Sequence, residues 1–169
     1  RRPPRSTRKE SSAASDVYKR QHEIGHALYT PMKEWQNAVD EEKIPHSFLN
    51  VIEDARIEKL VKRKYAGLKQ TFIRGYRDLI QKDFFGTKDR DVNEMLLIDR
   101  LNMHFKSSYI ESDIDFTSAE LDIVDRMKNL ETFEDVKVLA KELSDYCTCL
   151  LYTSDAADDS LRVDLGGRR

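Results

Sequence analysis

The chain has no apolar run long enough to cross a membrane. Such a span needs about 20 consecutive apolar residues, and charged side chains interrupt every apolar stretch of the 169-residue sequence before that length. Cysteine is scarce as well, since Cys147 and Cys149 are the only two. That number is too small for a disulfide framework. These absences predict a soluble protein rather than a membrane protein or a disulfide-stabilised secreted domain.

Neither end of the chain has the apolar period of a helix or a strand, and neither resembles a signal peptide. Codons for residues 11–21 can be chosen so that their reverse complement, shifted by one base, translates to the sequence at 149–159. Residues 1–10 and 160–169 can be related by reverse complementation in the same way. One DNA string therefore accounts for both ends, and it resembles a transposase-type sequencing adapter; a natural inverted repeat is the alternative. We expect residues 1–21 and 149–169 to be adapter-encoded, disordered or spuriously helical, and residues 22–148 to be a fragment of a longer protein.

The chain also lacks a large excess of charge of either sign. The full chain has 29 basic and 31 acidic residues, of which ten basic and six acidic residues lie in the two end segments. The remaining 19 basic and 25 acidic residues give the 127 residues from 22 to 148 a net charge of −6. A nucleic-acid-binding module normally carries a basic footprint, so we expect no nucleic acid as a partner. Because Cys149 lies in an end segment, a Cys147–Cys149 metal or redox pair is not expected either.

Helical patterns fill the central segment, and no strand or hairpin pattern is convincing. We expect helices over residues 22–30, ending before Pro31, over 47–65 with Ser47 as the cap, and over 68–85 with Gly86 as the terminator. Asp91 is expected to cap a further helix that reaches residue 105. Thr117 and Glu120 form a capping-box pattern, and Thr132 is expected to start the last helix. The sequence predicts a mainly α fold.

The sharpest chemical signal is the HEIGH segment, with His22, Glu23 and His26. Residues four apart lie on one face of a helix, so both imidazoles can bind one tetrahedral Zn²⁺. Glu23 lies about 100° round the helix from His22 and can act as general base on water activated by the metal. The extended motif HExxHxxGxxH would need Gly and His where Tyr29 and Met32 stand, so we expect the third ligand to come from another helix. HExxH is short, and a coincidental occurrence on a surface helix is the alternative.

The helix after Pro45 offers the third ligand within the segment NVIEDARIE. On a helical wheel, Glu53 lies at the edge of the apolar arc, whereas Asp54 and Glu58 point largely away from it. We therefore expect Glu53 to be the third ligand, with Asp54 as the alternative. The arc itself is defined by Phe48, Leu49, Ile52, Ala55 and Leu60.

Arg56 falls inside the same apolar arc. A buried guanidinium is costly unless it is paired, and Glu53 lies one turn before it. We expect Arg56 to orient the ligand carboxylate or to stabilise negative charge on the substrate oxygen, which would make it catalytic together with Glu23. The alternative is that its side chain snorkels to the surface.

Residues 22–86, with HEIGHALYTP, NVIEDARIEKLVKRKY and GYRDLIQKDFFG, resemble the metallopeptidase region of large tailed-phage proteins. Such regions are often joined to a von Willebrand A-type domain, in proteins similar to the cobaltochelatase subunit CobT. The resemblance implies a zincin-like domain of gluzincin type with His22, His26 and Glu53 as zinc ligands and Glu23 as base. The strands that precede the HExxH helix in a zincin, and the downstream von Willebrand A-type domain, are not in this sequence.

Together these features predict a zinc-dependent metallopeptidase that hydrolyses a peptide or protein substrate. We expect it to be phage-encoded and cytoplasmic, either in the host cell or in a virion, with no membrane partner. Two alternatives remain: a catalytically silent zincin-like scaffold that binds metal or partners, and a helical domain in which HExxH occurs by coincidence.

Overall fold

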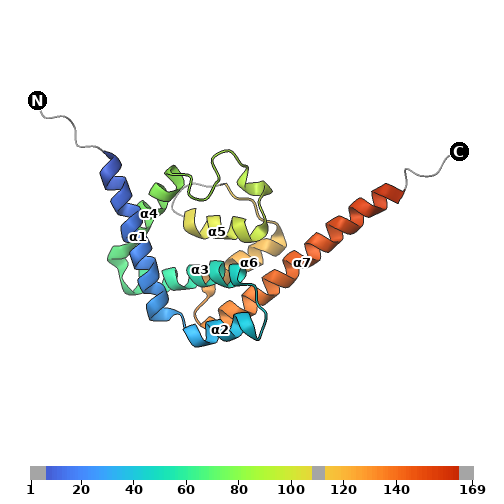
Figure 1. Cartoon of the computed structure of the whole chain (residues 1–169), viewed down its shortest axis with the longest axis horizontal. Helices are drawn as coiled ribbons and strands as arrows, with labels where there is room; N and C mark the ends of the chain where they lie inside the picture. The colour runs from blue at the N-terminus through green and yellow to red at the C-terminus, as the bar shows by residue number, and fades with distance from the viewer. Residues whose placement is uncertain (1–6, 108–112, 164–169) are drawn as a thin grey trace, which may run out of the picture.

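A computed structural model describes residues 7–107 and 113–163, and the side chains of residues 14–106 and 113–149. Within these residues the chain is helical and contains no strand (Figure 1). The mainly α prediction is confirmed. The elements are α1 (Thr7–Tyr29), α2 (Met32–Asp40), α3 (His46–Lys64), η1 (Ala66–Leu68), α4 (Lys69–Gln81), η2 (Val92–Glu94), α5 (Leu97–Ser107), α6 (Ser118–Asn129) and α7 (Phe133–Val163).

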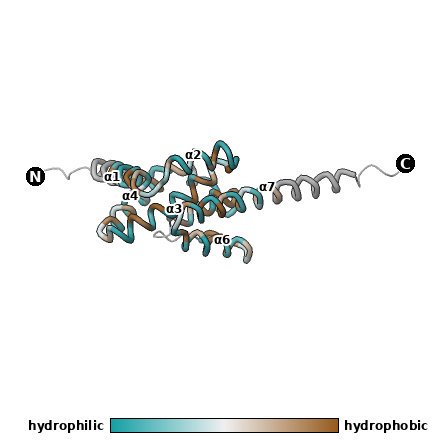
Figure 2. The backbone as a smooth tube through the Cα atoms, turned by 90° about the horizontal axis from the view of Figure 1, so that it is seen from below, coloured by the Kyte–Doolittle hydropathy of each residue, from teal (hydrophilic) through white to brown (hydrophobic). Residues whose placement is uncertain are grey.

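Helix α3 is the central element, and it contacts α1, α5, α6 and α7. It is buried on most sides, polar as well as apolar, because its neighbours surround it. Figure 2 shows hydrophilic and hydrophobic residues alternating along the backbone of the helices. The buried side chains of α3 are Leu49, Ile52, Glu53, Asp54, Arg56, Ile57, Glu58 and Val61.

Two apolar cores flank α3. The major core joins α3 to α2, α5, α6 and α7, and the minor core joins α3 to α1 and α4. The buried residues of the minor core are Tyr18, Val61, Phe72, Tyr76 and Leu79. Those of the major core are Ala38, Ile44, Leu49, Ile52, Leu97, Ile98, Leu101, Val124, Met127, Leu130, Phe133, Val136, Leu139, Ala140 and Leu143.

Helices α1 and α4 approach each other closely at Gly75. A Cβ atom added to Gly75 would overlap Cβ of Tyr18 and lie 2.8 Å from its Cγ. Only a residue without a side chain allows this contact. Gly75 therefore lets α1 lie against α4, and α4 holds α1 in position beside α3.

Some predicted helix boundaries are confirmed and others are corrected. The helix expected to start at residue 22 begins at Thr7, and the helix expected over residues 68–85 ends at Gln81, so Gly86 does not terminate it. Helix α1 ends at Tyr29, just before the Thr30–Pro31 step, and Thr117 forms a complete capping box with Glu120. Ser47 does not cap α3, because Pro45 is already the extended N-cap residue and provides no side-chain hydrogen bond. Asp91 caps only the short helix η2, because Met95 returns to extended backbone before α5 begins.

The described parts of the two segments expected to be adapter-encoded belong to the first and last helices. Helix α1 begins at Thr7 and α7 runs to Val163, while residues 1–6 and 164–169 lie outside the described residues. The adapter origin of 1–21 and 149–169 stays a prediction. Within the described part of the chain, no helix combines the length and apolar character that crossing a bilayer requires, and Cys147 and Cys149 are both free thiols.

Candidate metal centre

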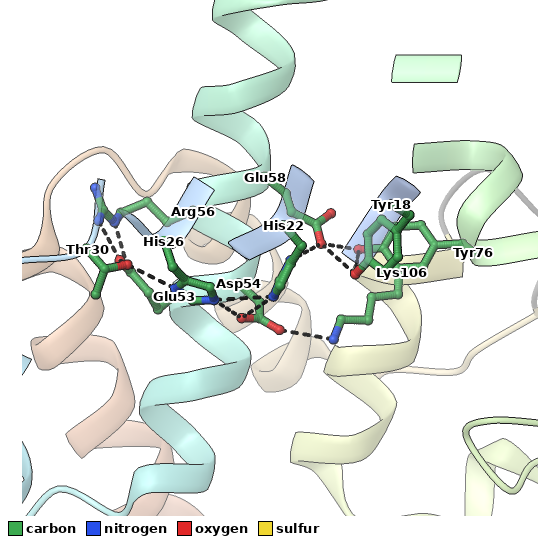
Figure 3. Close-up of polar contacts among 10 residues, drawn as sticks. All are labelled: Tyr18, His22, His26, Thr30, Glu53, Asp54, Arg56, Glu58, Tyr76 and Lys106. Carbon is green, nitrogen blue, oxygen red and sulfur yellow. Dashed lines mark hydrogen bonds and ion pairs between the residues drawn. The ribbon is translucent and has the colours of Figure 1, made fainter. Parts of the chain in front are cut away.

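Helices α1 and α3 bring two imidazoles and a carboxylate together. His22 and His26 lie one turn apart on α1, and their Nε2 atoms are 3.2 Å apart. Oδ1 of Asp54, on α3, lies 3.3 Å from Nε2 of His22 and 3.1 Å from Nε2 of His26. These three atoms form a nearly equilateral triangle (Figure 3). They are the group in the described residues that could bind a metal ion.

The size of this triangle fits a tetrahedral zinc ion. Zinc binds histidine nitrogen and carboxylate oxygen at about 2.0–2.2 Å, so neighbouring ligands of a tetrahedral site lie about 3.3–3.5 Å apart. The three edges of 3.1–3.3 Å are close to that spacing. Three protein ligands leave the fourth position to water or substrate, which is the arrangement of catalytic rather than structural zinc sites.

The carboxylate beside the imidazoles belongs to Asp54 and not to Glu53, which was the expected ligand. The helical wheel also placed Asp54 and Glu58 away from the interior, and that prediction is wrong, because both are only 4% exposed. The wheel assumed one buried face for α3. In the structure α1, α4 and α5 cover its polar side as well, so Asp54 and Glu58 face the histidines.

Each histidine has a second polar partner at its other ring nitrogen. Nδ1 of His26 lies 3.0 Å from Oγ1 of Thr30, within hydrogen-bond distance. Nδ1 of His22 lies 3.3 Å from Oε1 of Glu58, within ion-pair distance but without hydrogen-bond geometry. Metal-binding histidines are normally oriented in this way, by a carboxylate or another oxygen behind the ring. Both imidazoles therefore present Nε2 to the centre of the triangle.

Glu53 and Arg56 form a buried ion pair beside the triangle. Arg56 donates hydrogen bonds to both carboxylate oxygens of Glu53, at 2.7 and 2.6 Å. It also donates to the backbone oxygens of Tyr29, at 2.8 Å, and of Glu131, at 3.3 Å. The alternative in which Arg56 snorkels to the surface is wrong, because the residue is 4% exposed.

This ion pair reaches the histidines through Thr30. The hydroxyl of Thr30 donates a 2.6 Å hydrogen bond to Oε1 of Glu53 and lies beside Nδ1 of His26. Glu53 and Arg56 thus act on His26 through Thr30 rather than on the centre of the triangle.

Two lysines and two tyrosines surround the carboxylates. Lys106, on α5, donates a 3.0 Å hydrogen bond to Oδ2 of Asp54, the oxygen that faces away from the imidazoles. Lys62 forms a 3.1 Å ion pair with Oε2 of Glu58. Tyr76 donates a short hydrogen bond to Oε1 of Glu58, and Tyr18 lies 3.3 Å from the same oxygen.

The charges of this cluster are strongly coupled. Burial lowers the pKa of His22, but the carboxylates of Asp54 and Glu58 outweigh burial and raise this pKa to about 9. Burial acts to raise the pKa of Asp54, yet the two imidazoles and Lys106 hold it well below its usual range. Burial also acts to raise the pKa of Glu58, but the contacts with His22 and Lys62 outweigh burial and lower this pKa. Without a metal, the two carboxylates favour the protonated form of His22, and a bound cation would displace that proton.

Glu23 is exposed on α1 and does not contact the triangle. Among the described residues it has no hydrogen-bond or ion-pair partner. Although Glu23 follows His22 directly in the sequence, its side chain lies on the solvent side of α1.

Sequence analysis missed Lys106 and Tyr76, which carry no motif and come from helices distant in sequence. Asp54 and Glu58 had a usable signal. Their spacing of four residues on α3 repeats the spacing of His22 and His26 on α1, and two such pairs match when their helices pack side by side.

Comparison with known proteins assigns the chain to no family. No protein-family model, no curated protein and no solved structure matches it.

Proposed function

We propose that the chain is the metal-binding part of a zinc-dependent peptidase of the HExxH class, with Asp54 as the third ligand in place of the glutamate Glu53 that the gluzincin resemblance implied. The observation that carries this proposal is the triangle of His22 Nε2, His26 Nε2 and Asp54 Oδ1, with edges of 3.1–3.3 Å. A mixed nitrogen and oxygen ligand set suits zinc. The HExxH segment adds a carboxylate, Glu23, at the position of a general base.

Each residue then has a separate role. His22, His26 and Asp54 hold the ion, which when bound would activate a water molecule and polarise the substrate carbonyl. Glu58 and Thr30 fix the orientations of the two imidazoles. Glu23 would accept the proton, for which its side chain must turn from the solvent side of α1 to within about 3 Å of the reacting water.

Arg56 is assigned a positioning role and not a catalytic one. Four hydrogen bonds engage its guanidinium, two of them with Glu53. Negative charge on a substrate oxygen would have to compete with that buried ion pair. Arg56 instead holds Glu53, which holds Thr30 against His26.

The substrate in this proposal is a peptide or protein. The link to tailed-phage proteins, the cytoplasmic or virion location and a downstream von Willebrand A-type partner domain belong to the same proposal, and they rest on the sequence resemblance alone. A catalytically silent scaffold is the second candidate. The exposure of Glu23 and its lack of contact with the triangle favour that candidate.

Zinc content tests the proposal directly. Elemental analysis of the purified, dialysed chain should find about one zinc ion per chain, and Asp54→Asn should lose it. Glu53→Gln is the matched control, since it removes the neighbouring carboxylate charge outside the triangle, and it should keep most of the zinc. A folded wild-type chain without zinc, or loss of zinc only in Glu53→Gln, would contradict the assigned site.

Peptide hydrolysis then separates the two candidates. With zinc bound, the peptidase predicts cleavage of an unstructured protein such as casein, and loss of that cleavage in Glu23→Gln without loss of zinc. Zinc binding without cleavage in either protein would favour the scaffold.

A further inference from the structure

A chain of hydrogen bonds runs from the buried ion pair of Arg56 and Glu53 through Thr30 to His26 (Figure 3). Thr30 directly follows the last residue of α1 and lies four positions after His26. The chain of hydrogen bonds ends at Nδ1 of His26, whereas Nε2 of the same ring belongs to the triangle. Its directions decide which of these two nitrogens carries the ring proton.

The ion pair fixes the first direction. Both carboxylate oxygens of Glu53 accept hydrogen bonds from Arg56, at 2.7 and 2.6 Å. The carboxylate is therefore also the acceptor toward the hydroxyl of Thr30, which lies 2.6 Å from Oε1. A threonine hydroxyl has a single proton. Thr30 donates that proton to Glu53 and has none for a second neighbour.

His26 must then be the donor in its contact with Thr30. Nδ1 of His26 lies 3.0 Å from Oγ1 of Thr30, which can only accept. A neutral imidazole has one donor and one acceptor nitrogen, and the hydrogen bond at one nitrogen sets the state of the other. A proton on Nδ1 leaves Nε2 with a lone pair. That is the tautomer that can bind a metal ion from within the triangle.

Asp54 acts against this tautomer. Its Oδ1 lies 3.1 Å from Nε2 of His26 and would accept a proton carried there. The carboxylate of Asp54 has two other partners, however, since His22 lies 3.3 Å and Lys106 lies 3.0 Å from it. Within the part of the chain that the structure describes, His26 is the one side-chain donor to the oxygen of Thr30. A proton on Nδ1 therefore satisfies Thr30 and leaves Asp54 with its other partners.

We propose that Thr30 is a positioning residue that holds His26 in the tautomer with its proton on Nδ1, so that Nε2 is ready for a metal ion before the ion arrives. The proposal rests on the proposed function, because the metal-binding role is what requires this tautomer. It also gives the buried ion pair a role at a distance from the triangle. Glu53, held by Arg56, keeps the proton of the Thr30 hydroxyl turned away from the ring.

Nuclear magnetic resonance of the full chain, labelled with ¹⁵N-histidine and measured in chelator, tests the tautomer independently of zinc. Long-range ¹H–¹⁵N correlation spectra distinguish rings protonated on Nδ1, on Nε2 or on both, and His26→Asn identifies the signals of this ring among the four histidines. At about pH 8, where an unperturbed histidine is neutral, we expect the proton on Nδ1. Thr30→Ser should keep it there, and Thr30→Val should move it to Nε2. A wild-type ring protonated mainly on Nε2, or on both nitrogens, would overturn the proposal.

Zinc affinity, measured by competition with a chromogenic chelator, gives the second readout. Thr30→Val should bind zinc about tenfold more weakly than the wild type, because groups behind a metal-binding histidine typically contribute 10–100-fold, and Thr30→Ser should restore most of the affinity. Thr148→Val is the matched control, since its hydroxyl bonds the backbone oxygen of Ser144, also four residues away. It should change neither the tautomer nor the affinity. Unchanged affinity in Thr30→Val, or an equal loss in Thr148→Val, would contradict the role of Thr30.

The two readouts separate this proposal from the proposed function. The Nδ1 tautomer in a wild-type chain that binds no zinc would leave Thr30 as the residue that sets the tautomer and reject the metal site. Zinc binding by a chain whose His26 carries its proton on Nε2 in chelator would do the reverse. The wild-type spectrum decides the tautomer even where Thr30→Val fails to fold, which circular dichroism would show.

Discussion

Replacement of Lys106 by methionine should destabilise the metal-free protein and increase the stabilisation that zinc provides. Lys106 Nζ lies 3.0 Å from Asp54 Oδ2, and the two side chains are 14% and 6% exposed. Lys106→Met keeps most of the aliphatic length and removes the charge. In the metal-free protein it leaves one oxygen of a buried carboxylate without its partner.

The size of the first effect follows from the loss of a hydrogen bond to a charged group, which is about 2 kcal/mol. For a chain of this length each kcal/mol shifts the melting temperature by about 2–4 °C, so Lys106→Met should melt about 4–8 °C below the wild type in chelator. Zinc should then raise the melting temperature of the variant by more than that of the wild type, because Asp54 no longer shares its charge with an ammonium group.

Thermal unfolding followed by circular dichroism, with chelator and with zinc, measures both effects. Lys59→Met is the matched control, since the pair of Lys59 with Glu131 is more exposed, at 28% and 50%, and such pairs contribute about 0–1 kcal/mol. Equal melting of Lys106→Met and wild type in chelator would refute the energetic argument. A smaller response to zinc in the variant would refute the assignment of Asp54 as a ligand that Lys106 restrains.

Three further predictions concern the surroundings of the centre. Gly75→Ala should destabilise the chain by about 1–3 kcal/mol in urea unfolding, because the added methyl group overlaps the neighbouring helix; an unchanged midpoint would contradict that close approach. Arg56→Leu should cost about 3–5 kcal/mol, as it leaves a buried carboxylate unpaired, whereas Arg63→Leu, at a 60% exposed side chain, should leave the unfolding midpoint almost unchanged. In chelator, the raised pKa of His22 contributes stability that is complete below about pH 6.5 and is lost as the pH rises through about 9, while the lowered pKa of Asp54 contributes stability that is lost in acid. Unfolding free energies measured from pH 2 to 10 should therefore decline at both ends, the acid decline falling mainly below about pH 4, and a flat alkaline side would contradict the charged state of His22.

The helices were predictable because their signals are local. Proline at 31 ends α1, and the pair Thr117 and Glu120 closes a capping box through atoms only three residues apart. The caps at Ser47 and Asp91 were wrong for a local reason too. Pro45 already begins α3 in extended backbone, and the side chain of Asp91 is satisfied after one short turn.

Only the two histidines of the site were predictable from the sequence. The spacing of His22 and His26 on one helix is enough to bring the two rings together, because it depends on helix geometry alone. The choice between Glu53 and Asp54 depends on which neighbours cover α3, and a helical wheel contains no neighbours. The contact of Lys106 with Asp54 joins residues 52 positions apart, and no local pattern indicates such a pairing.

The two separate apolar cores have a consequence for local opening. Helices α1 and α4 pack on α3 through the minor core, whose five buried residues form the smaller of the two contacts. Cooperative opening units often follow such divisions, so backbone amides of α1 and α4 should exchange with deuterium sooner than those in the described part of α7. An ion held by His22, His26 and Asp54 would cross-link α1 to α3 across this boundary. Bound zinc would then slow amide exchange in α1 and leave the exchange of α7 almost unchanged.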